Sequence, residues 1–182
     1  MDFRPLDIPD VVLIRPDVFS DHRGYFFESW ERRKFATAGI ASNFVQDNQS
    51  HSVRHTLRGL HYQLEHPQGK LARVVTGTVF DVAVDLRRSS ATFGRWVGTT
   101  LSETNHHMLW VPPGFAHGFL VLSEYADFVY RCTDFWAATD ERSILWNDPD
   151  LNVAWPLPRG IEPLISTKDA QAQRFHDARC FP

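Results

Sequence analysis

Runs of β-branched and aromatic residues, each bounded by Gly, Pro, Asn or Asp, recur along most of the chain. Four of these runs predict strands: residues 10–15, 71–76, 78–86 and 115–122. The Pro112-Pro113-Gly114 sequence and residues 147–150 predict turns. Many short strands separated by turns are typical of an antiparallel sandwich or barrel.

The run at residues 78–86 alternates between two faces, because successive side chains of a strand point in opposite directions. One face is apolar: Phe80, Val82, Val84 and Leu86. The other face mixes carboxylates with small apolar residues: Val79, Asp81, Ala83 and Asp85. We therefore expect Asp81 to project among small apolar neighbours.

Helical signals are few. Residues 30–38 follow Ser29, a candidate N-cap, and stop at Gly39, whereas residues 167–178 follow Ser166. No repeat, low-complexity tract or linker interrupts the chain. The sequence therefore predicts a single, mainly β domain over residues 1–182 with a few short helices.

A chain of 182 residues, 43% of them hydrophobic and 23% charged, is ordinary for a compact domain with one core. The formal net charge of -3 supplies no general attraction for nucleic acid or an anionic membrane, and we expect neither as a partner. An anionic ligand must then be met by a local basic cluster, for which the candidates are Arg23, Arg58, Lys70 and Arg73.

The two cysteines, Cys132 and Cys180, form no disulfide framework and suit a reducing compartment. The apolar stretch at residues 11–14 is too short for a signal-peptide core or a membrane span. We expect a cytoplasmic protein.

His61 and Lys70 place an imidazole and an ammonium a short turn apart in a strand-rich region. Proton abstraction next to a carbonyl needs such a pair, because the imidazole takes the proton and the cation stabilises the enolate oxygen. The structural alternative is a hydrogen-bonded strand histidine and a solvated loop lysine.

The sequence Pro112-Pro113-Gly114-Phe115-Ala116-His117 resembles the second signature of the cupin jelly roll. The first signature of that fold would supply His-x-His and a following Glu as metal ligands, but this chain has Gln63 in place of the second His. An amide is a poor replacement for an imidazole on a transition metal. We expect a cupin scaffold with no catalytic metal and no cofactor.

Tyr130 lies in a run in which period-two alternation places it with Phe128 and Cys132. Its hydroxyl would emerge from an apolar face and could return a proton to a substrate, but a core tyrosine with a hydrogen-bonded hydroxyl fits the same pattern. Aromatic residues mostly fill cores or dimer interfaces, although Phe26 and Trp136 lie beside polar residues that could face a ligand.

An ordered series of segments resembles the dTDP-4-dehydrorhamnose 3,5-epimerases of deoxysugar biosynthesis. The segments are residues 19–28, 44–50, 57–63, 68–71, 79–85, 112–119, 130–133, 144–149 and 166–170. The resemblance implies that a dTDP-linked 4-keto-6-deoxyhexose is epimerised at carbons 3 and 5 without cofactor or metal. The alternatives are a mono-epimerase, a non-catalytic nucleotide-sugar binding cupin and a metal-dependent cupin enzyme.

The resemblance also implies roles for individual residues. His61 would be the base, Tyr130 the acid and Lys70 the charge partner of the enolate oxygen. Asp169 would orient and charge-stabilise the imidazole, and Asp81 is a second carboxylate that could serve it. Asp169 has a structural alternative, since Ser166 and Asp169 have the spacing of a capping box.

Substrate contacts are implied at matching positions: Arg23, Phe26, Glu28, Gln46, Asn48, Arg58, His117 and, less directly, Arg73. Trp136 is a further candidate, because Phe135 and Trp136 stand where the family pattern leads us to expect tyrosines, which leaves open how many centres are inverted. The resemblance implies a homodimer in which residues 23–28 complete the partner's site.

One point of geometry is open. Arg58 and His61 are three residues apart, so a regular strand would send them to opposite faces. A bulge at Gly59 would bring them to the same side.

Overall fold

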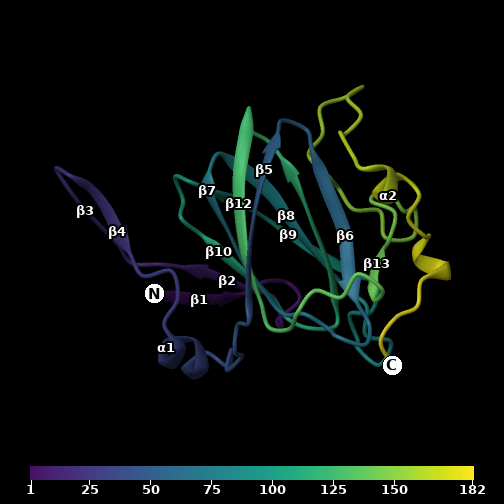
Figure 1. Cartoon of the computed structure of the whole chain (residues 1–182), viewed down its shortest axis with the longest axis horizontal. Helices are drawn as coiled ribbons and strands as arrows, with labels where there is room; N and C mark the ends of the chain where they lie inside the picture. Colours follow the sequence, from purple (N-terminus) through teal and green to yellow (C-terminus); the bar gives the residue numbers. More distant parts are fainter.

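Two antiparallel sheets face each other and form the body of the protein in the computed structural model, which describes residues 1–182 (Figure 1). The six-stranded sheet runs in the order β1 (Asp2–Pro5), β2 (Val12–Arg15), β10 (Met108–Val111), β7 (Lys70–Thr76), β12 (Tyr125–Cys132) and β5 (Gln46–Val53). The five-stranded sheet runs in the order β13 (Glu141–Ser143), β6 (Leu57–Gln63), β11 (Phe115–Val121), β8 (Thr78–Asp85) and β9 (Trp96–Ser102). This architecture confirms the predicted mainly β, cupin-like jelly roll.

A two-stranded hairpin, β3 (Val18–Asp21) and β4 (Gly24–Phe27), projects away from the two sheets (Figure 1). Phe19 pairs with Phe26 along it, and both side chains are largely exposed, at 65% and 70%. The hairpin therefore presents aromatic surface that nothing in its own chain covers.

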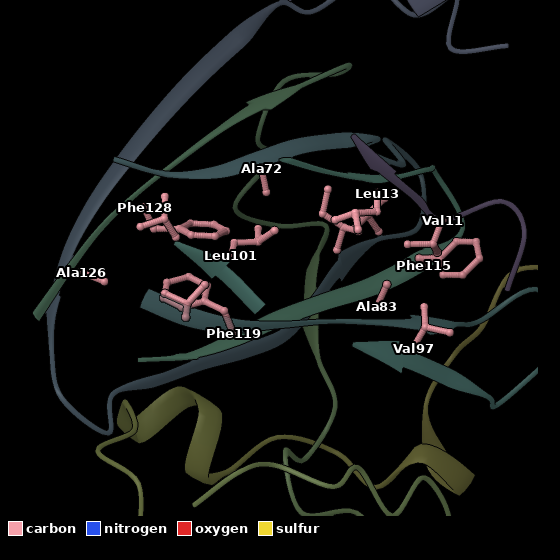
Figure 2. Close-up of a cluster of buried hydrophobic side chains, with 14 of the residues drawn as sticks. Val11, Leu13, Ala72, Ala83, Val97, Leu101, Phe115, Phe119, Ala126 and Phe128 are labelled. Atoms are coloured by element: carbon pink, nitrogen blue, oxygen red, sulfur yellow. The ribbon is translucent and has the colours of Figure 1, made fainter. Parts of the chain in front are cut away.

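The main core lies between the sheets and is lined by alternate residues of the facing strands (Figure 2). The rings of Phe119 on β11 and Phe128 on β12 stack with their centroids 4.2 Å apart, which joins the two sheets. Burying one such ring stabilises the fold by about 1.5–3 kcal/mol. Val79 and Ala83 of β8 belong to this core, as their alternation with Asp81 predicts.

The opposite face of β8 is buried as well. Val82, Val84 and Leu86 pack with Ile144 and Leu151 of the long C-terminal segment in a second cluster. The predicted alternation is therefore confirmed, and the strand separates two apolar layers.

Both predicted helices are shorter than expected. The first, α1 (Arg32–Thr37), begins after Glu31, whose carboxylate accepts a hydrogen bond from Lys34 N at 2.9 Å. Ser29 is not the N-cap. Trp30 instead lies before the helix, with its ring 5.8 Å from that of Phe44.

The second helix, α2 (Thr167–Ala170), does begin after Ser166 but has only four residues, followed by the 3₁₀ helix η1 (Phe175–Asp177). The expectation of a continuous helix to residue 178 is wrong because tertiary contacts compete for the backbone. Gln173 O accepts from Leu145 N at 2.9 Å, and Asp148 accepts from Phe175 N at 2.9 Å. No helix in the structure is long and apolar enough to cross a membrane.

Candidate active site

A bulge in β6 brings Arg58 and His61 to the same cavity. The register with β11 pairs Arg58 with Phe119 and His61 with His117, so three steps on β6 match two on β11. Gly59 permits this path, since its φ is +123° and a Cβ would lie only 2.5 Å from Gly118 Cα. The bulge expected at Gly59 is confirmed.

The cavity, of about 300 Å³, lies between the two sheets. Six of the residues proposed from the sequence line it: Asn48, Arg58, His61, Lys70, His117 and Tyr130. They come from five strands of both sheets, β5, β6, β7, β11 and β12. His61 and Tyr130 stand on opposing sheets, so an imidazole and a phenol face one space from its two walls.

His61 is paired with Asp169. Its Nε2 is 2.6 Å from a carboxylate oxygen of Asp169, which is only 3% exposed. Burial opposes ionisation of this carboxyl, but hydrogen bonds from His61 and Ser166 and the charge of His61 hold its pKa below the usual value. The backbone N–H of Asp169 also donates to Ser166 Oγ at 3.1 Å. Capping and dyad formation thus use different groups of the same residue.

Asp81 serves a different imidazole from the one expected. It is fully buried, and its carboxylate lies 2.8 Å from Nε2 of His117. His117 is the register partner of His61, so the two neighbouring imidazoles each have a carboxylate of their own. The expectation that Asp81 contacts His61 is wrong, because β11, which carries His117, lies between β8 and β6 in the sheet.

Lys70 and Tyr130 lie side by side, with Nζ of Lys70 5.9 Å from the centroid of the Tyr130 ring. Burial lowers the pKa of Lys70, although the anionic forms of Cys132, Glu141 and Asp81 oppose that shift. Burial raises the pKa of Tyr130 to about 12. The phenol is therefore a proton donor at neutral pH, beside the buried Lys70 side chain.

Gln46 is at the edge of this site. Its amide nitrogen donates to Asn48 Oδ1 at 3.0 Å, and its amide oxygen accepts from the backbone N–H of Trp136 at 2.9 Å. The Trp136 side chain is 54% exposed. Gln46 and Trp136, both proposed from the sequence, therefore lie next to the cavity.

Four proposed residues lie away from the cavity of their own chain. Arg23, Phe26 and Glu28 belong to the hairpin region, where Arg23 pairs with Asp21 and Glu28 with Lys34. Arg73 lies on β7 in register with Val129, one step from the pair formed by Ala72 and Tyr130. Its side chain is therefore on the outer face of the six-stranded sheet, contrary to expectation.

Glu141 is a cavity residue that sequence reasoning missed. It lies in the three-residue strand β13, which is too short to show a period, and it forms an ion pair with Lys168. Burial opposes its ionisation, but the hydrogen bond and charge of Lys168, the charge of His61 and the Trp136 side chain together lower its pKa. Its placement depends on the pairing of Glu141 with Gln63, which the local sequence does not signal.

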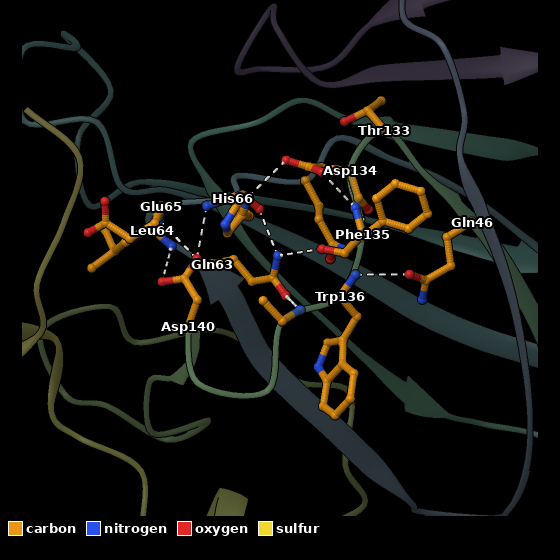
Figure 3. Close-up of polar contacts among 12 residues, drawn as sticks. Gln46, Gln63, Leu64, Glu65, His66, Thr133, Asp134, Phe135, Trp136 and Asp140 are labelled. Atoms are coloured by element: carbon orange, nitrogen blue, oxygen red, sulfur yellow. Dashed lines mark hydrogen bonds and ion pairs between the residues drawn. The ribbon is translucent and has the colours of Figure 1, made fainter.

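No group of three His, Cys, Asp or Glu side chains is arranged to hold a metal ion. Gln63, at the position of the ligand expected in a metal cupin, uses its amide to donate to the backbone oxygens of His66 and Phe135, at 2.7 and 3.1 Å (Figure 3). The residue is thus committed to backbone contacts.

The sequence matches the family model described as dTDP-4-dehydrorhamnose 3,5-epimerase over residues 5–177. The protein of that name from Pseudomonas aeruginosa is 59% identical over 178 residues, covering 97% of each chain. The one from Shigella flexneri is 53% identical over 177 residues, covering 96% of each chain.

Solved structures are similar over nearly the whole chain. The dTDP-6-deoxy-D-glucose-3,5-epimerase of Legionella pneumophila, in complex with dTDP-4-keto-L-rhamnose, has a TM-score of 0.94 and 45% identity, covering 98% of this chain and 94% of that one. ChmJ, a 3'-monoepimerase from Streptomyces bikiniensis in complex with dTDP-quinovose, has a TM-score of 0.87 and 35% identity, covering 94% and 86%.

Proposed function

The chain belongs to the dTDP-4-dehydrorhamnose 3,5-epimerase family, and from that premise we propose its reaction. It inverts carbon 3 and carbon 5 of dTDP-4-dehydro-6-deoxy-D-glucose and yields dTDP-4-dehydro-L-rhamnose, in dTDP-L-rhamnose biosynthesis. The observation that carries this proposal is the placement of His61 and Tyr130 on opposing walls of one cavity, with Lys70 beside the phenol.

Both carbons flank the carbon-4 ketone, so loss of either proton gives an enolate. His61 takes the proton, and the electron pair of the broken C–H bond moves onto the ketone oxygen beside the Lys70 ammonium. Tyr130 then gives its proton to the same carbon from the opposite face, which inverts the centre. Proton exchange with water restores the phenol and the neutral imidazole for the next inversion.

The Asp169 carboxylate sets the proton arrangement of the base. Because Nε2–H of His61 donates to the carboxylate, the lone pair of the neutral imidazole is on Nδ1. The carboxylate also stabilises the imidazolium that forms when Nδ1 takes the substrate proton. These steps use the protein's own side chains and need neither cofactor nor metal.

The nucleotide is held by polar groups around the cavity and by a second copy of the chain. Asn48, Gln46, Arg58 and His117 offer amide, guanidinium and imidazole groups, and the fork of Arg58 suits a diphosphate. The hairpin residues Arg23, Phe26 and Glu28 contribute to the partner's site in a homodimer.

Exposure of the hairpin supports this dimer, because Phe19 and Phe26 are more than half exposed and the hairpin that carries them projects away from the two sheets (Figure 1). The dimer can be tested by mixing two inactive variants, Arg23→Glu and His61→Ala. A shared site predicts that subunit exchange restores activity, because one site of each mixed dimer has neither substitution. Activity that stays absent in mixed dimers shown to form would refute the shared site.

The enzyme is a single domain that works in the cytoplasm.

Deuterium labelling tests the reaction. In deuterated water the purified enzyme should introduce deuterium at both carbon 3 and carbon 5 of the 4-keto sugar nucleotide, measured by NMR. His61→Ala should stop exchange at both. Label at one carbon would identify a mono-epimerase. The likeness to ChmJ is the observation behind this second candidate. Label at neither carbon, with binding retained, would identify a nucleotide-sugar binding protein.

A further inference from the structure

The side chain of Gln63 links the strand that carries His61 to two loops. It is 3% exposed and lies two residues after His61 on β6. Its amide nitrogen donates to the backbone oxygens of His66 and Phe135, and its amide oxygen accepts from Ala137 N at 2.8 Å (Figure 3). Both amide hydrogens and the amide oxygen are therefore committed.

A second glutamine holds the same segment from the opposite sheet. Gln46 on β5 accepts from the backbone N–H of Trp136 (Figure 3). Three successive residues, Phe135, Trp136 and Ala137, thus have backbone groups bound by side chains of two facing strands. Their placement is decided by these strands, and not by helix or strand hydrogen bonds of their own.

Asp140 closes the network. Its buried carboxylate accepts from the backbone N–H groups of Leu64, Glu65 and His66, at 3.2, 2.9 and 2.9 Å. Burial opposes its ionisation, yet these three donors hold its pKa below the usual value. Gln63 and Asp140 therefore join the same two loops from both sides, and a buried polar network satisfied in this way is rigid.

The segment fixed by this network leads directly to a residue of the cavity. Residues 134–140 connect β12, which carries Tyr130, to β13, whose Glu141 lines the cavity. The Trp136 side chain lies close enough to Glu141 to lower its pKa. A shift of the segment would move Trp136 and Glu141 relative to His61.

We propose that Gln63 is a positioning residue that controls whether both carbons are inverted. Its amide holds Trp136 and Glu141 so that the sugar ring can present first one carbon and then the other to His61. The inference rests on the proposed function. Displacement of a positioning group by about 1 Å costs about 10²-fold in rate, and the loss is unequal where two carbons need different ring placements.

The test compares Gln63→Leu with the wild type in deuterated water. We expect the ratio of label at the two carbons to change by about tenfold or more, with a smaller change in KM for the nucleotide sugar. The fluorescence response of Trp136 to thymidine diphosphate should also change. A ratio equal to that of the wild type would overturn the proposal, even if the overall rate falls.

Asp148→Leu is the matched control. Asp148 is 1% exposed and accepts three backbone hydrogen bonds, from residues 150, 151 and 175, but it lies among residues on the outer side of the five-stranded sheet. It should lower the melting temperature without changing the label ratio. An equal change of the ratio in both variants would show a merely structural role and overturn the proposal.

Two further measurements cover the remaining cases. If Gln63→Leu does not fold, Gln63→Glu keeps the acceptor for Ala137 N but loses both donors, and the same change of ratio is expected. A double-mutant cycle with Trp136→Ala should be non-additive, because Gln63 acts through the segment that carries Trp136. Additive effects would refute the proposed route. Absence of label in the wild type would refute the proposed function, whereas an unchanged ratio in the variants refutes only the role of Gln63.

Discussion

Replacing Asp169 with Asn tests whether the carboxylate acts in the reaction or only belongs to a helix end. The substitution keeps the size of the side chain and the backbone N–H that donates to Ser166, so α2 should persist. It removes the negative charge beside His61. It also allows the amide to donate to Nε2, which would move the imidazole proton to Nδ1 and leave the base without its lone pair.

The magnitude follows from the geometry of the pair. The His61 and Asp169 side chains are 27% and 5% exposed and their atoms approach to 2.6 Å, so solvent screens them only in part. At an effective dielectric constant of about 20, opposite unit charges about 4 Å apart attract by about 4 kcal/mol. In the proposed mechanism the imidazole gains its positive charge when it takes the substrate proton, so most of this attraction stabilises the transition state. At about 1.4 kcal/mol per tenfold change, we expect kcat to fall by about 10²- to 10³-fold.

The assay is the rate of deuterium incorporation at each carbon, with the melting temperature measured in parallel. Ser166→Ala is the control, since it removes the cap at a cost of about 0.5–2 kcal/mol in stability. It keeps the carboxylate beside His61, which loses only its hydrogen bond from Ser166. It should lower the melting temperature and change the exchange rates far less than Asp169→Asn does. Asp169→Asn with exchange rates within about threefold of the wild type would refute the dyad and leave capping as the role of this residue.

Three other predictions concern Tyr130, Lys70 and the absence of a catalytic metal. Tyr130→Phe should reduce net epimerisation by about 10²-fold or more while sparing deuterium exchange at the carbon that loses its proton, because the base His61 and the cation Lys70 remain. Equal losses of exchange and epimerisation would contradict the role of Tyr130 as the acid. Lys70→Met should reduce kcat by about 10²-fold and yet raise the melting temperature, because the buried ammonium no longer has to be desolvated. Burial lowers the pKa of Lys70 in the folded state. The free energy of unfolding of the wild type should therefore rise relative to that of Lys70→Met as the pH increases from the lowered pKa toward 10.5. Urea unfolding across this pH range measures the difference. Dialysis against EDTA should leave the turnover rate unchanged; a loss that a divalent ion restores would show that a metal takes part.

The strands and their faces could be predicted because their signal is local. Alternation in residues 78–86 placed Asp81 with Val79 and Ala83, and the structure has that arrangement. Gly59 also carried a local signal, since glycine readily adopts the positive φ found at this bulge. The helices were less predictable, because the helical tendency after Ser166 is overcome at Gln173 by a hydrogen bond to a distant residue.

The partners of the charged residues needed the tertiary structure. Two carboxylates were candidates for His61, and the sequence could not choose between them. Asp81 meets His117 because β11 lies between β8 and β6, and Asp169 meets His61 because α2 docks against β6. Glu141 and the amide of Gln63 had no sequence signal, because their roles depend on which backbone groups of a neighbouring loop come within reach.

The sequence by itself determined the class of fold, the alternation along each strand and the residue types available for proton transfer, because these depend on neighbours within a few positions. Only the tertiary structure decided which of them meet. His61 and Asp169 are 108 positions apart, and His61 and Tyr130 come from different sheets, so their encounter depends on how two buried apolar faces pack together. Packing is a property of the whole chain, and for that reason no local pattern records it.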